Sequence, residues 1–331
     1  MEKMRAARSV ELGKMVCELT EVRPPEEGEV IVRTQLAAIC GSDLHIVFMG
    51  SGIAPLNGDW NFPHGFPGHE GIGEVVESRF AGLKIKERVL TVPGRPFTRC
   101  FAETLTLPGS SCITVPEDLP LAELLMAQQL GTAIFALRQN PVDVVGKNVM
   151  VMGQGSAGVF FAYLLKRAGA AKVIVSDLSE ARLDLGRQVS GTDVAVIANG
   201  GNVKEAVMDH TGGEGVDYLV EAVGRSESQL ESVEYMKLDG KILFFGLPDT
   251  SKPIPFNFQE FFRKRITANT TYGTQFEPGL ASFRLALDLI IKKEIDVSKL
   301  VSHTFPIEQI DEAMHQAHEG AKSTLKVALS F

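Results

Sequence analysis

The amino-acid sequence predicts an α/β protein with two domains, one mainly β and one built on a doubly wound parallel sheet. At 331 residues, the chain is about twice as long as a usual single domain. Residues 1–137 are rich in glycine and proline and contain alternating stretches such as residues 29–37, a pattern typical of twisted strands and turns. From about residue 147, short apolar runs alternate with segments of helix length, which indicates a parallel sheet with crossover helices.

Six apolar runs in the second part of the chain are the expected strands of the parallel sheet. They occupy residues 149–153, 172–177, 193–198, 216–224, 241–246 and 265–270. A helix-like stretch at residues 279–293 follows, and the tail at residues 294–331 ends in the strand-like sequence LKVALSF. From the pattern alone, this tail either extends the sheet or returns to the first domain.

The composition excludes several classes of protein. The net charge of -8 argues against nucleic acid or an anionic membrane as a partner, and 44% hydrophobic residues argue against disorder. The four cysteines, at 17, 40, 100 and 112, form no CxxC pair, which favours a reducing compartment over a disulfide framework. Because no secretory signal or membrane span is apparent, we expect a cytoplasmic protein.

A glycine motif follows the first expected strand of the parallel sheet. Gly153 permits a tight turn, Gly155 lets the backbone approach a pyrophosphate, and Gly158 lets the next helix pack closely on the sheet. The strand-turn-helix context and an acid at Asp177 favour a dinucleotide site over a simple helix-opening turn in which Asp177 only caps a loop. The expected cofactor-binding residues are Gly153, Gly155, Ser156, Ala157, Gly158, Asp177, Arg182, Val223 and Gly246.

Asp177 indicates which dinucleotide binds. A carboxylate at this position accepts hydrogen bonds from the adenosine ribose hydroxyls and repels a 2′-phosphate, so we expect NAD rather than NADP. Arg182 lies one turn into the next helix. It either approaches a phosphate or is a solvated residue that pairs with Asp177.

The first domain contains two segments with metal-binding side chains. CGSDLH begins with Cys40 and contains Ser42 and His45, and GHEGIGEVV contains His69 and Glu70. A thiolate, an imidazole and a carboxylate suit zinc. Each residue also has a structural explanation, since Cys40 can be a buried thiol, His69 a loop histidine and Glu70 a charge at a strand edge.

Together with the glycine motif, these segments resemble the zinc-dependent medium-chain alcohol and polyol dehydrogenases, which include sorbitol, threonine and sugar dehydrogenases. The resemblance extends to Arg88-Val89, to Phe101-Ala102-Glu103 and to the tail sequence HTFPIEQIDEA. It implies a GroES-like catalytic domain made of residues 1–137 and 280–331, with a Rossmann domain at residues 138–279 between them.

The resemblance also implies a set of zinc ligands. Cys40 and His69 are expected to bind zinc directly, and Glu70 to be a ligand or an exchanging neighbour of the metal. Gln128 stands where the family has an acidic or cysteine ligand, and it either binds zinc weakly or lines the pocket. The four-cysteine lobe of the family is replaced by TVPGRPFTRC, so we expect one catalytic zinc, no structural zinc, and structural roles for Cys17, Cys100 and Cys112.

The implied reaction is hydride transfer between NAD(H) and an alcohol or carbonyl substrate, most simply a polyol, a sugar or another small secondary alcohol. Ser42 and His45 match the family's proton relay, although Ser42 can also cap a helix and His45 can be a surface residue. An aromatic-rich stretch either walls the pocket or packs beneath its own loop. Its members are Phe48, Met49, Trp60, Phe62, His64 and Phe66.

Two other functions are compatible with the fold. One is a zinc-free reductase of activated C=C bonds, whose members usually lack the cysteine and glutamate present here. The other is a dinucleotide-binding protein without turnover. The last expected strand, RITANTTYG, resembles the edge through which family members pair, so we expect a homodimer or homotetramer.

Overall fold

The computed structural model describes residues 2–49, 62–199, 201–250, 252–319 and 324–331. The chain forms two compact units. The first unit comprises Met1–Gly131 and Gly273–Phe331, and the second unit is Thr132–Tyr272. The boundaries between the two units lie at residues 131/132 and 272/273. The sequence predicts them at 137/138 and 279/280.

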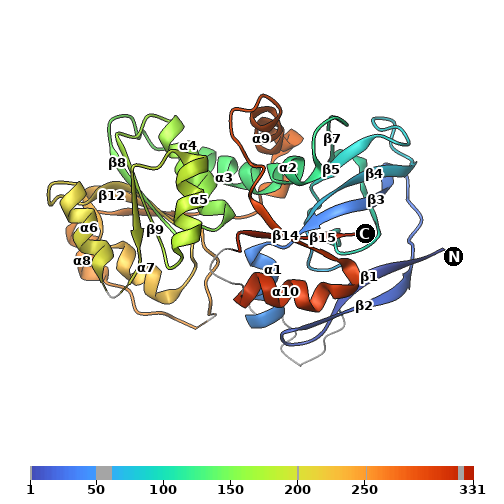
Figure 1. The fold of residues 1–331 in the computed structure, drawn as a ribbon, viewed down its shortest axis with the longest axis horizontal. Helices are drawn as coiled ribbons and strands as arrows, with labels where there is room; N and C mark the ends of the chain where they lie inside the picture. The colour runs from blue at the N-terminus through green and yellow to red at the C-terminus, as the bar shows by residue number, and fades with distance from the viewer. Residues whose placement is uncertain (1, 50–61, 200, 251, 320–323) are drawn as a thin grey trace. The chain divides into compact units, whose positions relative to one another are not determined.

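The first unit is built on a seven-stranded sheet in the order β14-β15-β3-β4-β5-β7, and β6 pairs with the first half of β3 (Figure 1). A separate hairpin joins β1 and β2. The strands are β1 (Lys3–Glu11), β2 (Lys14–Glu21), β3 (Glu29–Ala38), β4 (Glu70–Ser78), β5 (Arg88–Thr91), β6 (Thr104–Pro108), β7 (Cys112–Thr114), β14 (Val301–Pro306) and β15 (Lys326–Ser330). The helices are α1 (Gly41–Met49), α2 (Leu121–Leu125), α9 (Ala281–Ile291), α10 (Ile310–Glu319) and α3 (Ala127–Gln139), which begins in this unit.

The C-terminal tail returns to the first unit. β15 pairs antiparallel with β3, with Ala328 opposite Ala38, and parallel with β14. The first unit therefore contains strands from both ends of the chain. The strands of this unit and the C-terminal tail share one apolar core, which includes Val32 of β3, Val75 of β4 and Met314 of α10.

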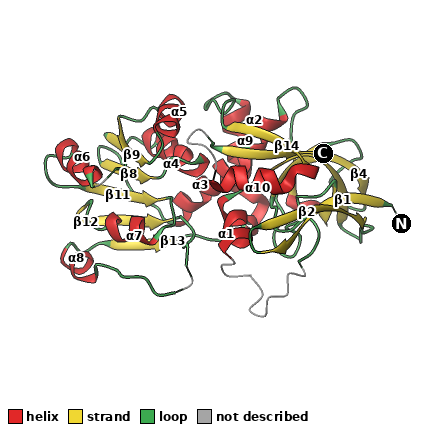
Figure 2. Cartoon of the chain, turned by 60° about the horizontal axis from the view of Figure 1, so that its bottom comes forward, coloured by secondary structure: helices red, strands yellow, loops and turns green. Residues whose placement is uncertain are grey.

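The second unit contains a six-stranded parallel sheet in the order β10-β9-β8-β11-β12-β13 (Figure 2). Each of the six predicted apolar runs forms one strand. The strands are β8 (Asn148–Met152), β9 (Lys172–Asp177), β10 (Val194–Ile197), β11 (Val216–Glu221), β12 (Met236–Phe244) and β13 (Thr267–Thr270). The helices are α4 (Ser156–Arg167), α5 (Glu180–Ser190), α6 (Asn202–His210), α7 (Ser226–Ser232) and α8 (Phe258–Arg263).

This strand order is that of the Rossmann fold, and it confirms the predicted fold class. The order reverses between β8 and β11, where Met152 lies opposite Glu221. In such sheets, ligands bind beyond the carboxyl ends of the strands at this reversal. The core beneath it is apolar and includes Met150, Leu219 and Ile242.

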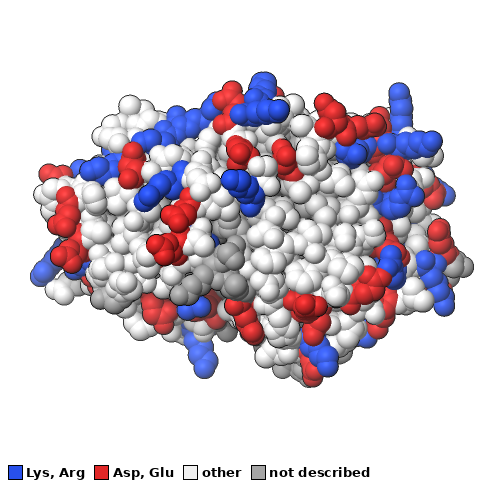
Figure 3. All heavy atoms as spheres, viewed as in Figure 1, with Lys and Arg blue, Asp and Glu red and all other residues white. Residues whose placement is uncertain are grey.

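The surface carries mixed charge. Acidic and basic side chains are interspersed over the face shown in Figure 3. Among the helices that the structure describes, none is long and apolar enough to cross a bilayer.

Candidate metal centre and nucleotide site

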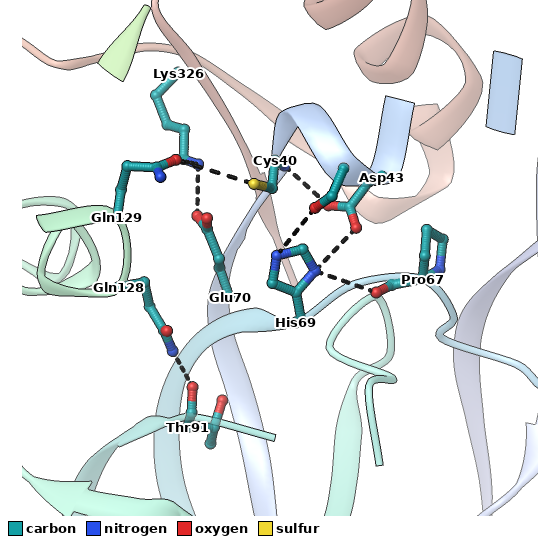
Figure 4. Close-up of polar contacts among 10 residues, drawn as sticks. Cys40, Asp43, Pro67, His69, Glu70, Thr91, Gln128, Gln129 and Lys326 are labelled. Atoms are coloured by element: carbon teal, nitrogen blue, oxygen red, sulfur yellow. Dashed lines mark hydrogen bonds and ion pairs between the residues drawn. The ribbon is translucent and has the colours of Figure 1, made fainter. Parts of the chain in front are cut away.

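Strand pairing brings the two metal-binding segments of the first unit together. In the antiparallel pairing of β3 with β4, Ala38 lies opposite Glu70. Cys40 follows the end of β3, and His69 immediately precedes β4, so both side chains lie at the same end of this strand pair. One possible ligand atom from each of Cys40, His69 and Glu70 lies within 4.8 Å of the others, in a largely buried cluster (Figure 4).

Asp43 holds the His69 ring in place. Its Oδ1 lies 3.0 Å from His69 Nδ1, and its Oδ2 accepts a hydrogen bond of 2.9 Å from the Cys40 backbone N–H. Burial opposes protonation of His69, but Asp43 and Cys40 outweigh it and raise the pKa of His69 well above its usual range. A carboxylate on one ring nitrogen is the usual way in which a metal-binding histidine is oriented.

A buried lysine neutralises Glu70. Lys326, the first residue of β15, places its Nζ 2.6 Å from Glu70 Oε2, and the two side chains are 2% and 4% exposed. Burial lowers the pKa of Lys326, but the charges of Glu70 and Cys40 outweigh it, and the pKa is raised. Lys326 was not among the predicted site residues. Its position in the sequence, a charged residue at the start of an apolar strand, is the one indication of a buried partner.

The two glutamines at the start of α3 point in different directions. Gln128 Nε2 donates a hydrogen bond to the Thr91 carbonyl oxygen. Gln129 instead directs Oε1 to within 3.3 Å of Lys326 Nζ and 4.0 Å of Cys40 Sγ. Successive side chains on a helix diverge by about 100°. The amide of Gln129 therefore faces Cys40 and Lys326, whereas Gln128, for which we predicted weak zinc binding or a place in the pocket wall, faces Thr91.

Ser42 and His45 both lie on α1, directly after Cys40. Ser42 Oγ is 3.4 Å from His69 Nε2, which places a hydroxyl beside the cluster. His45 is partly buried on the same helix, one turn after Ser42. Whether the two residues relay a proton stays a prediction.

The aromatic residues expected near the pocket make packing contacts. Phe62 stacks on Phe66 with ring centres 5.1 Å apart, and Phe48 stacks on His318 at 4.2 Å. His64 Nε2 lies 2.7 Å from Glu18 Oε1. Met49 is the last residue of α1. Trp60 lies outside the described residues.

The donor set fits zinc. A thiolate, an imidazole and a carboxylate converge within reach of one ion, and a buried carboxylate fixes the imidazole. Among the residues that the structure describes, this is the one such group of His, Cys, Asp and Glu.

Burial raises the pKa of the Cys100 and Cys112 thiols to about 12, so both remain protonated, as buried structural thiols do.

The glycine turn of the second unit has the geometry that a dinucleotide needs. Gly153 adopts a positive φ of 86° at the end of β8. A Cβ at Gly158 would lie 1.9 Å from the Gly153 carbonyl oxygen, so only glycine allows α4 to pack here. A Cβ at Gly155 would meet nothing within 4 Å. The protein leaves this space open beside the N-terminus of α4, where Ser156 and Ala157 form the first turn.

Asp177 is held at the end of β9 by two backbone groups. Its Oδ2 accepts a hydrogen bond of 2.7 Å from Gln154 N–H, and its Oδ1 accepts one of 2.8 Å from Ser179 N–H. Arg182 lies in the first turn of α5, where its N–H donates to Ser179 Oγ. The carboxylate is thus fixed directly beside the glycine turn.

Glu221 organises the turn that contains Val223. Its Oε1 accepts hydrogen bonds of 2.9 Å from both Val223 N–H and Gly224 N–H, and one of 2.7 Å from Ser228 Oγ. Burial raises the pKa of this carboxyl group. Gly246 follows β12, and a Cβ there would lie 2.2 Å from the Gly224 nitrogen. The roles of Val223 and Gly246 in cofactor binding stay predictions, and Glu221 was not among the predicted residues.

Comparison with known proteins matches both units. Residues 26–117 match the alcohol dehydrogenase GroES-like domain family, and residues 157–292 match the zinc-binding dehydrogenase family. The L-threonine 3-dehydrogenase of Proteus mirabilis is 25% identical over 91% of this chain and 93% of its own length. The probable D-xylulose reductase A of Aspergillus clavatus is 25% identical over 91% and 89%.

The same fold occurs in the crystal structure of an oxidoreductase of unknown specificity from Escherichia coli. Its TM-score is 0.86, at 21% identity and 99% coverage of both chains. A GroES-like unit with a Cys-His-Glu cluster and a Rossmann unit with a glycine turn together define a zinc-binding, nucleotide-dependent dehydrogenase. The chain belongs to the family of zinc-dependent medium-chain alcohol and polyol dehydrogenases.

Asp177→Ser should raise the preference for NADP. Removing the carboxylate removes its repulsion of a 2′-phosphate, which is worth on the order of 1.4 kcal/mol, or about tenfold. The ratio of the NADP and NAD dissociation constants, measured by fluorescence titration, gives the effect. Asp184→Ser, at an exposed position on α5, is the control. An unchanged ratio in Asp177→Ser would contradict the role of this carboxylate.

Lys326→Met should destabilise the metal-free protein by about 3–5 kcal/mol, because it leaves the buried Glu70 carboxylate unpaired. Lys292→Met breaks an exposed pair with Asp288, in which the side chains are 60% and 50% exposed, and should cost less than about 1 kcal/mol. Urea unfolding of both variants measures the difference. Equal free energies of unfolding for the two variants would contradict the claim that Lys326 neutralises a buried Glu70 carboxylate.

Proposed function

We propose that this protein oxidises a small secondary alcohol with NAD, or reduces the corresponding carbonyl, at a zinc ion held by Cys40 and His69 beside Glu70. The observation that carries the proposal is the buried convergence of these three side chains, with Asp43 fixing the imidazole. The relatives named for L-threonine and D-xylulose favour a polyol, a sugar or a similar hydroxylated substrate.

Each residue at the centre has a part in this reaction. Zinc, when bound, supplies a Lewis acid that stabilises the alkoxide form of the substrate. Asp43 keeps the His69 ring oriented, and Lys326 balances the charge of Glu70. Ser42 Oγ, beside His69, would accept the alcohol proton as it gives up its own, and His45, one turn later on the same helix, would take up the proton that the hydroxyl releases.

The second unit binds the nucleotide. The N-terminus of α4 after Gly155 would hold the pyrophosphate, and Asp177 would accept hydrogen bonds from the ribose hydroxyls. Gly155 supports this assignment because a side chain there would occupy otherwise open space. We also propose a single catalytic zinc per chain, since a short segment replaces the cysteine lobe.

Removing zinc should abolish NADH formation across a panel of polyols, sugars and hydroxy acids, and adding zinc should restore it. Cys40→Ser should lower kcat/KM by about 100-fold or more, because the metal contributes several kcal/mol to transition-state stabilisation. Cys17→Ser, which changes a cysteine outside the cluster, should leave kcat/KM unchanged. Zinc-independent turnover would favour a zinc-free reductase, and silence with zinc and NAD both bound would favour a binding protein.

We place the partner subunit at β13, in a homodimer or a dimer of dimers. All four residues of this strand are exposed, and within the described sheet β13 pairs only with β12. Phe258 and Phe262 of the preceding helix α8 are 65% and 72% exposed, and they line a hollow of about 530 Å³. An unpaired edge beside exposed aromatic rings is typical of a surface that is covered in the assembly.

The double variant Phe258→Glu/Phe262→Glu should halve the mass of the wild-type assembly in light scattering, because charged side chains cannot be buried unpaired at an interface. Ile85→Glu, at an exposed apolar position of the first unit, serves as the control and should keep the wild-type mass. A monomeric wild-type protein, or a double variant of unchanged mass, would refute pairing at this surface.

A further inference from the structure

Glu221, the last residue of β11, holds two turns of the second unit at once. Its backbone carbonyl oxygen accepts hydrogen bonds of 2.9 Å from both the Phe245 and the Gly246 N–H groups, just beyond the end of β12. Its side-chain Oε1 accepts the hydrogen bonds of 2.9 Å from Val223 and Gly224 that shape the turn after β11. Both turns are therefore fixed to this one residue.

The turn after β11 packs tightly against its neighbours on both sides. A Cβ at Gly246 would lie 2.2 Å from the Gly224 nitrogen, so a side chain there would force the two turns apart. On the other side, a Cβ at Gly153 would lie 2.9 Å from Val223 Cγ2, so the Val223 side chain lies against the glycine turn after β8. The turn after β11 is thus enclosed between the turns that follow β8 and β12.

The place of these turns in the sheet indicates which half of the dinucleotide they would meet. Asp177, at the end of β9, is the proposed partner of the adenosine ribose, and the glycine turn after β8 is that of the pyrophosphate. Because the strand order continues from β9 and β8 to β11 and β12, the nicotinamide half would extend over the ends of the last two strands (Figure 2). Apolar side chains are exposed there, since Val223 and Leu247 are 40% and 38% exposed, and such side chains suit one face of an aromatic ring.

The geometry points to Glu221 as a positioning residue for the nicotinamide half of the cofactor. Its carboxyl group is fully buried and acts through the turn that presents Val223, so it does not need to touch the cofactor. Without the acceptor Oε1, two backbone N–H groups would lose their partner inside the protein, and the turn would have to rearrange. This inference rests on the proposed function, which places NAD at the glycine turn and Asp177.

Binding of NADH and of ADP-ribose separates this role from a general structural one. ADP-ribose has the adenosine and pyrophosphate groups of the cofactor but lacks the nicotinamide ring, and the fluorescence of NADH comes from that ring. Glu221→Leu in the full-length protein should raise the dissociation constant of NADH by about tenfold or more and reduce the fluorescence enhancement of bound NADH. The dissociation constant of ADP-ribose, measured by calorimetry, should change by less than about threefold.

Two matched variants show whether the acceptor oxygen is what matters. Burial raises the pKa of Glu221, so Glu221→Gln, which resembles the protonated carboxyl group and keeps an acceptor oxygen, should leave both dissociation constants within about threefold of the wild type. Its amide nitrogen would replace Oε2, which has no hydrogen-bond partner among the described residues. Tyr218→Phe removes another buried oxygen of β11 that has no partner in the described part of the chain, and it should leave NADH binding and fluorescence unchanged.

Glu221→Asp provides the same test if Glu221→Leu does not fold, which the loss of a cooperative unfolding transition would reveal. The shorter side chain keeps the carboxyl group but withdraws its oxygens from the turn by one methylene group. This variant should weaken NADH binding by about threefold or more and leave ADP-ribose binding unchanged.

The outcomes distinguish this inference from the proposed function. Equal weakening of NADH and ADP-ribose binding by Glu221→Leu would overturn the inference, because the residue would then only stabilise the second unit. Unchanged NADH binding and fluorescence in Glu221→Leu, or an equal loss in Glu221→Gln, would also overturn it and leave the nucleotide site standing. Wild-type protein that binds neither NADH nor ADP-ribose would overturn the proposed nucleotide site and this inference together.

Discussion

The antiparallel register between β3 and β4 is the constraint on which the metal centre depends. It places Ala38 opposite Glu70, so the residues just beyond β3 and just before β4 meet at one end of the sheet. β15 joins the other edge of β3 with Ala328 opposite Ala38, and this register, continued by two residues, sets Lys326 opposite Cys40. Because a register slip of one residue reverses the direction of every side chain, the core that fixes this register also assembles the site.

Pairing of opposite charges explains how several ionisable side chains can be buried together at the metal centre. Asp43 faces His69, and Lys326 faces Glu70, so each buried carboxylate has a partner at close range. A buried charge without such a partner would cost several kcal/mol. The thiolate of Cys40 is left for the metal, and a neutral amide completes the surroundings without adding a further charge. The charges at this centre are therefore compensated, which is compatible with the zinc ion that we propose there.

Much of this organisation could be predicted from the sequence, because it follows from local patterns. Apolar runs predicted the strands of the second unit, and the glycine motif predicted the turn between β8 and α4, beside which Asp177 lies. The missed residues depend on contacts between segments far apart in the chain. Lys326 finds its partner only when the tail adds a strand beside β3, and Glu221 acts through a turn that its strand alone does not reveal. Gln128 and Gln129 are neighbours in sequence, and only the rotation of α3 determines which amide faces Cys40.

The most direct test of the account is an anomalous difference map at the zinc absorption edge, from crystals of zinc-loaded protein. The account predicts a peak about 2.3 Å from Cys40 Sγ and about 2.0 Å from a ring nitrogen of His69. A zinc ion bound elsewhere in protein that forms NADH, with these two side chains free of metal, would contradict it.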